Sequence, residues 1–204
     1  MDGVFMKKII KILVTLVLLI SAVWLADVWQ DKKALQENVI RLHVVGNSDS
    51  REDQSIKLLV KDAVVRYLQP LVEDFQDKEE AKEFVTRNLL SIQQIANDTL
   101  ENLGSDDRAI VRFGEEAFDT RKYETFSLPA GIYESLRIVI GDGQGKNWWC
   151  VVFPSLCMPA TSVGVQDTAV SAGFSQDLGS TLTRERNFRF FILDCFGKIE
   201  KLFH

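Results

Sequence analysis

The side chains of this 204-residue sequence that are best suited to covalent chemistry are its cysteines and its one internal histidine. Cys150 is a nucleophile by type, and His43 is the imidazole that would activate it as a general base. Together they would make the chain a thiol hydrolase. The sequence shows no carboxylate that would orient this imidazole, and an isolated histidine or cysteine on a strand is more often a packing residue.

Cys150 and Cys157 are also the natural pair for a disulfide. Closing a loop of about eight residues would contribute roughly 2.5 kcal/mol in the chain-entropy treatment. Pro154 can turn the chain back between them, whereas a straight strand would hold the two sulfurs too far apart. The sequence therefore leaves two alternatives open: a disulfide between these cysteines, or two buried free thiols. No metal site is predicted, because a C-x6-C spacing and two distant histidines do not match common zinc patterns.

A glycine-rich segment, GDGQG at 141–145, lies between two apolar runs at 137–140 and 148–153. The runs predict two strands, and the glycines allow positive φ, so the sequence predicts a β-hairpin. A phosphate-binding loop is disfavoured, because in nucleotide-binding motifs the glycines open a helix and here a strand follows. In the second run Trp148 and Trp149 point to opposite faces, and both faces are apolar.

The N-terminus has the composition of an export signal. Three lysines precede a charge-free run of fifteen residues at 12–26, which is short for a membrane span of about 20 residues. We expect residues 1–26 to be a signal peptide or an N-terminal membrane anchor. Cleavage is left open, because Ala26 suits a cleavage site but Trp24, two residues earlier, is bulky where a small residue is preferred.

The remaining chain matches one ordinary domain. We expect a polar tether at residues 27–38, followed by a single extracytoplasmic domain at 39–204. Hydrophobic content of 46% is that of a globular protein. The formal net charge of −5 disfavours a nucleic-acid partner, because nucleic-acid binding requires a basic surface.

Periodicity predicts an α+β fold with two long amphipathic helices packed on a largely antiparallel sheet, and a short C-terminal helix. Ser50 and Asp77 are the expected helix caps, Pro70 is expected to close or kink the first helix, and Gly104 is the expected left-handed stop of the second. The helices are predicted at 52–69, at 78–103 and from about 196 onward. Strands are predicted at 39–45, 109–113, 117–123, 137–140, 148–153 and 188–193, and a long loop at 160–187.

The polar turn after the first strand has two interpretations. Asn47, Ser48, Asp49 and Asp53 would form a carboxylate and hydroxyl site, but capping of the following helix explains most of them. Capping does not explain why the turn directly follows a strand that carries His43.

Two segments resemble a known family. VIRLHVVGNSDSREDQSIKLLVKDAV and LPAGIYESLRIVIGDGQGKNWWCVVFPSLC are similar to stage II sporulation protein R of endospore-forming bacteria. The order of parts also agrees, so the resemblance extends over nearly the whole chain. It implies a signalling protein made in the forespore and secreted into the intermembrane space, where it activates a membrane-embedded aspartic protease of the mother cell that matures the sigma-E precursor.

The resemblance implies no enzymatic activity and no cofactor. We therefore expect a contact module that touches the membrane only through its N-terminal segment and binds the protease through the hairpin and the turn before the first long helix. The residues predicted to bind this partner are His43, Asn47, Asp49, Arg137, Asn147, Trp148 and Trp149.

Overall fold

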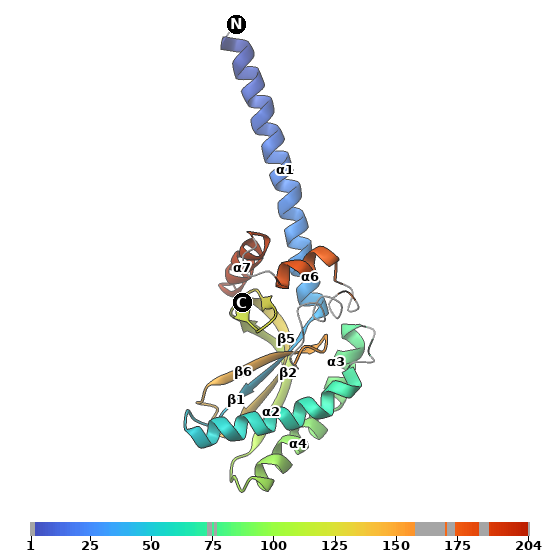
Figure 1. Cartoon of the computed structure of the whole chain (residues 1–204), viewed down its shortest axis with the longest axis vertical. Coiled ribbons are helices and arrows are strands. Elements are labelled where there is room, and N and C mark those ends of the chain that lie inside the picture. The colour runs from blue at the N-terminus through green and yellow to red at the C-terminus, as the bar shows by residue number, and fades with distance from the viewer. Residues whose placement is uncertain are drawn as a thin grey trace.

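The computed structural model describes residues 3–72, 75, 77–157, 170, 174–183 and 188–203. Within these residues the chain combines six helices with a mostly antiparallel four-stranded sheet, which is the mixed α/β composition that the sequence predicts. Figure 1 shows the sheet in the body of the molecule and one long helix, α1 (Gly3–Asn38), projecting from it.

The four strands run in the order β2-β5-β1-β6 across the sheet. Strand β1 pairs in parallel with β5 and antiparallel with β6, and β2 pairs antiparallel with β5. Every position of β1 is buried, so the first strand of the domain lies at its centre. The bounds are β1 (Ile40–Val45), β2 (Ala109–Phe118), β5 (Gly131–Ile140) and β6 (Asn147–Phe153), while β3 (Arg121–Lys122) and β4 (Ser127–Leu128) form a separate two-stranded sheet.

The predicted hairpin is wrong. Strands β5 and β6 do not pair with each other, because β1 lies between them and bonds to both. The glycine-rich segment is therefore a crossover loop, residues 141–146, that passes over the end of β1 and spans two strand spacings, about 10 Å. Strand β2 is also continuous where the sequence predicted two shorter strands, at 109–113 and 117–123.

Three helices cover one face of the sheet: α2 (Arg51–Val72), α3 (Lys78–Arg87) and α4 (Leu89–Asn102). The predicted caps are confirmed, since the Ser50 hydroxyl accepts from the Asp53 amide, the Asp77 carboxylate accepts from the Glu80 amide, and Gly104 has φ +72°. Helix α2 ends at Val72, two residues after Pro70, so the proline lies in its last turn, close to the predicted end at residue 69.

The single helix predicted at 78–103 is two helices that meet at Asn88. The Asn88 side chain donates to the Phe84 carbonyl at 2.8 Å, which is the local bonding by which asparagine interrupts a helical ladder. The apolar stripe is continuous across this break, so periodicity alone does not reveal it.

Among the described residues, the opposite face is covered only in part, by the last turns of α1, by α6 (Gln176–Thr183) and by α7 (Phe188–Lys201). These helices correct three predictions. The polar tether at 27–38 is instead helical, the strand at 188–193 belongs to α7, and α7 begins at Phe188 rather than near 196. Of the predicted loop at 160–187, residues 176–183 are helical and most of the remainder lies outside the described residues.

Two features explain why the sequence did not predict these helices. Residues 27–38 alternate apolar and charged side chains at helical spacing, so Val28 and Leu35 are fully buried while their polar neighbours bond to α7. In α7, Gly197 packs closely against Ala130, the residue before β5. A Cβ at position 197 would be 1.5 Å from the Ala130 carbonyl oxygen. An aromatic run that looks like a strand becomes a helix because this contact holds it against β5.

The N-terminal part of α1 is long and apolar enough to cross a membrane. Its side chains are exposed, with relative accessibilities of 72% at Val23 and 64% at Leu18. This helix is compatible with either a signal peptide or a membrane anchor.

Candidate functional site

The turn after β1 and the crossover loop form one hydrogen-bonded unit. The Asn47 side-chain oxygen accepts from the Asp142 amide at 2.9 Å, and its carbonyl accepts from the Gln144 amide at 2.9 Å. Asp49 accepts from the Lys146 amide at 2.7 Å. Asn47 and Asp49 thus position the loop by accepting hydrogen bonds from its backbone amides.

The glycines of the crossover loop are explained by this close approach. A Cβ at Gly145 would lie 2.3 Å from the Ser48 carbonyl oxygen, and a Cβ at Gly141 would lie 2.4 Å from the Asn47 side chain. Gly141 and Gly143 also have positive φ. The two segments that carry the family resemblance therefore meet in space at one end of the sheet.

His43 lies on the partly covered face, between two oxygen acceptors. Its Nδ1 is 2.9 Å from Glu116 Oε1 and its Nε2 is 3.0 Å from Asn147 Oδ1. Arg137 donates to the same Glu116 oxygen at 2.9 Å. The protonated imidazole can donate from both nitrogens here, and in its neutral form the Asn147 amide must turn its NH2 toward Nε2.

Glu116 is a half-buried carboxylate that bridges strands β1, β2 and β5. Burial alone would raise the pKa of Glu116, but the hydrogen bond from His43 and the charge of Arg137 outweigh it, so this pKa is lowered. Its second oxygen is buried and has no hydrogen-bond partner. The carboxylate therefore remains ionised and holds His43 and Arg137 in fixed positions.

The two tryptophans of β6 have different surroundings. Trp148 packs against the core beneath α2, with Lys61 Nζ 4.8 Å from its ring centroid. Trp149 points to the other face, where His43 stacks on it at 5.5 Å and the Arg121 guanidinium lies 3.4 Å from its ring centroid. Both rings are half-buried. Only Trp149 belongs to the surface that carries His43 and Arg137.

This surface, which we call the open face, contains two hollows. One, of about 460 Å³, lies over β2 and β5 and includes Arg112, Glu116, Ser135 and Arg137 in its lining. The other, of about 230 Å³, lies between Glu116 and Trp149 and includes Asp119 and Arg121. Ion-paired side chains line these hollows together with apolar ones, which include Ile110 and Val139 in the first and Phe118 and Trp149 in the second. This mixed composition is that of a surface suited to contact with another protein.

The arrangement expected for a thiol hydrolase is not formed. Cys150 is buried in the core beneath the helices and is joined to Cys157 by a disulfide with a Cα–Cα distance of 5.2 Å. His43 lies on the opposite face, paired in register with Trp149, the neighbour of Cys150. Because successive side chains of a strand point to opposite faces, the thiol and the imidazole are separated by the sheet.

The contacts of His43 show which site residues the sequence alone did not reveal. Glu116 and Arg121 line the open face with His43, but they lie between the two segments that carry the resemblance. Ser135 lies within the second of these segments, two residues before Arg137. Glu116 had one visible signal, its place on the polar face of an alternating strand that also carries Arg112. Among the described residues, no cluster of three or more histidine, cysteine or acidic side chains is arranged to hold a metal ion.

Comparison with known proteins gives two matches. The family model of stage II sporulation protein R matches residues 36–162, a segment that contains every strand of both sheets. Over 160 residues the chain is 36% identical to stage II sporulation protein R of Bacillus subtilis (strain 168), covering 74% of this chain and 71% of that protein. No solved structure matches the chain.

Proposed function

Because the chain belongs to the stage II sporulation protein R family, we propose that it is an exported sporulation signal that activates a membrane-embedded aspartic protease of the mother cell by direct contact. The protease then matures the sigma-E precursor. The proposed partner meets the open face, and the signal acts without catalytic chemistry of its own.

The main support for this proposal is that helices cover one face of the sheet more completely than the other. Helices seal one face, whereas the other leaves Arg137 and half-buried Trp149 accessible near Asn147. Glu116 fixes Arg137 before any partner arrives, so little side-chain entropy is lost on binding. Arginine and tryptophan are the residues that most often anchor protein interfaces.

Two further features suit an exported protein. The disulfide between Cys150 and Cys157 is of a kind that persists on the oxidising side of a membrane. The apolar part of α1 is compatible with a signal or an anchor that would direct the domain there. The predicted partner residues divide into two groups under this proposal. Arg137, Asn147 and Trp149 are accessible on the surface. Buried His43, together with Asn47, Asp49 and Trp148, supports this surface or the loop beside it.

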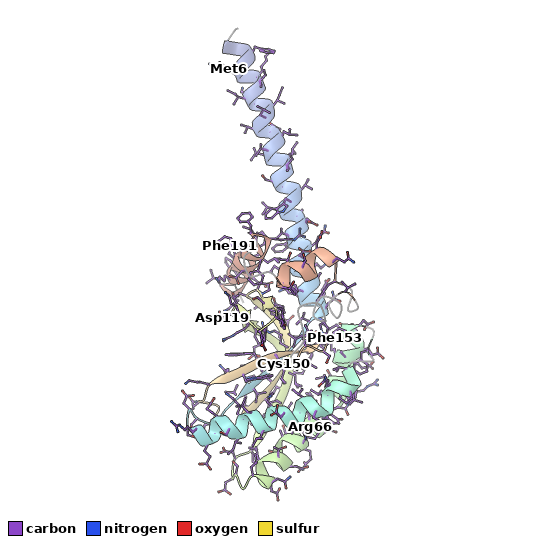
Figure 2. The ribbon with its side chains drawn as sticks, viewed as in Figure 1. Met6, Arg66, Asp119, Cys150, Phe153 and Phe191 are labelled. Carbon is purple, nitrogen blue, oxygen red and sulfur yellow. A yellow bond between two sulfur atoms is a disulfide. The ribbon has the colours of Figure 1, made fainter. Side chains whose placement is uncertain are left out.

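The test is reconstitution of the purified chain with the protease and the sigma-E precursor. Arg137→Ala should keep the melting temperature and lower the rate of precursor maturation, by roughly thirtyfold if the loss of contact reaches 2 kcal/mol. Arg66→Ala is the matched control, because Arg66 is an exposed arginine on α2, on the covered side of the sheet (Figure 2). Equal rates for both variants would exclude the open face as the contact surface.

Trp149→Ala is a second test of the same surface. It should reduce maturation, whereas Trp148→Ala, which removes a ring beneath α2, should lower the melting temperature. If every loss of signalling follows a loss of stability in these variants, the tryptophans act only as core residues.

A further inference from the structure

We propose that the start of α7 and the neighbouring turn of α1 form a lipid-binding ledge that seats the domain directly on the membrane spanned by α1. The ledge consists of Trp24, Leu25, Phe188 and Phe191. The occupant is the bilayer interface itself, and the inference does not depend on the protease proposal.

Helix α1 continues into the domain without a break. It is one continuous helix over Gly3–Asn38, and its last turns bury Val28 and Leu35 completely in the core. Asp31 and Lys32 are also buried, at 7% and 5% exposure. A rigid helix that is apolar at one end and part of the core at the other fixes both the distance and the tilt of the domain relative to the bilayer.

Helix α7 lies alongside α1 and is tied to it along its length. At its first residue, Phe188 stacks on Trp24 with ring centroids 5.6 Å apart. Arg189 bonds to Asp27 at 2.9 Å, and near the other end Glu200 bonds to Lys32 at 3.0 Å. The two helices therefore run in the same direction, and the start of α7 is the part nearest to the apolar span (Figure 1).

The aromatic side chains at this place are unusually exposed. Phe188 is 68% exposed and Phe191 is 58% exposed, and their rings stack with centroids 6.4 Å apart. Figure 2 shows Phe191 at the end of the domain from which α1 projects. The patch is continuous with the exposed apolar surface of α1, where Leu25 is 41% and Val23 is 72% exposed. Continuity with a span identifies the bilayer as what covers the patch, and aromatic rings favour the headgroup level.

The length of the apolar run is compatible with such a seat. Fifteen charge-free residues at 12–26 extend about 22 Å as a helix, whereas the hydrocarbon core is about 30 Å thick. Where the bilayer extends past this run on the side of the domain, it meets the ledge. Arg189 pairs with both Asp27 and Asp31, the first two acidic groups beyond the run, and offsets one of their two charges, which lowers the cost of placing them close to lipid.

Environment-sensitive fluorescence can test the ledge in the full chain. In a Cys195→Ser background, in which the remaining cysteines are joined as a disulfide, Phe191→Cys is labelled with NBD and reconstituted into vesicles of phosphatidylethanolamine and phosphatidylglycerol. The emission should shift to the blue and should be quenched by lipids that carry a nitroxide near the headgroup. Leu90→Cys is the matched control, since Leu90 is an 81% exposed apolar residue of α4, a helix that lies on the side of the domain away from α1 (Figure 1).

Three outcomes overturn the proposal. One is a water-like emission at position 191 in the inserted chain. Another is equal quenching at positions 90 and 191, which would mean that the whole domain lies on the lipid. The last is a blue shift at 191 that disappears when the chain is diluted with excess lipid, because a second copy of the chain would then be the occupant. A shift that persists on dilution, with lipid quenching at 191 alone, supports the ledge.

Discussion

The two faces of the central sheet are built from the same strands but are completed differently. On one face Leu42, Leu136 and Ile138 are fully buried beneath α2, α3 and α4. On the other, Tyr133 and Val151 are buried beneath α1, α6 and α7, but the sheet beyond them carries the charged side chains of the open face. The first face is therefore buried along its whole length, whereas the second divides into a half that is buried beneath helices and a half whose side chains are accessible.

The alternation of side chains along a strand keeps these two tasks separate. Neighbouring residues such as Ile138 and Val139, or Trp148 and Trp149, contribute to opposite faces, so a change on the open face leaves the helix-covered core intact. A contact surface can then vary in sequence without unfolding the domain.

The largest expected effect compares two adjacent residues of β5. Ile138→Ala should lower the free energy of unfolding by about 2 to 5 kcal/mol, because it leaves a cavity in a fully buried core. Val139→Ala should cost less than about 1 kcal/mol, because that side chain lies on the open face. Urea denaturation of the purified chain measures both. Similar costs would show that the open face is as well packed as the covered one.

The next largest expected effect compares the half of the second face that α7 covers with the open half. Gly197→Ala should destabilise the domain by about 1 to 3 kcal/mol, because its methyl group would overlap the Ala130 carbonyl and push α7 away from β5. Gly114→Ala is the control, since nothing lies within 4 Å of a Cβ there. Thermal melts of the two variants should differ clearly. A tolerated alanine at 197 would contradict the close contact between α7 and the strand.

The smallest expected effect is pH-dependent and concerns the contribution of Asp194, a residue of α7, to the stability of the fold. Burial alone would raise the pKa of Asp194, but hydrogen bonds from the Ala130 amide, Lys198 and Thr120 more than offset it, so this pKa is lowered. The ionised carboxylate therefore stabilises the fold above its unfolded pKa of about 4, and this contribution is lost as pH falls through the lower folded value.

Asp194→Asn tests this contribution. At neutral pH the variant should be less stable by about 1 to 2 kcal/mol, and the difference from the parent should shrink below pH 4. Exposed Asp98 on α4 provides the control variant, Asp98→Asn. A difference that stays constant between pH 7 and pH 3 would mean that Asp194 acts through packing and not through its charge.

The sequence predicted the open face only in part, for a reason visible in its residues. His43, Arg137, Asn147 and Trp149 were identified because they lie in or beside recognisable segments. Glu116, which holds two of them, comes from a strand that is distant in sequence and is positioned only by its pairing with β5. Asn47 and Asp49 were predicted to bind the partner, and the bonds that they make to the crossover loop could not be predicted from the sequence.

By itself the sequence determined what local interactions decide. The caps at Ser50 and Asp77, the left-handed stop at Gly104, the amphipathic stripe of α2 and the apolar N-terminal run depend on residues within a few turns of one another. Such features form in the same way wherever the segment lies in the fold.

Only the tertiary structure decided which strand lies beside which. An apolar strand such as β6 can pair with any neighbour of suitable length, and the insertion of β1 between β5 and β6 depends on backbone bonds formed far apart in sequence. The same holds for α7, whose aromatic run suits a strand until Gly197 packs on Ala130, and for residues 27–38, which become core only beside α7. Non-local contacts outweigh local propensity at these places, because burial of a whole face stabilises more than the preference of any one residue.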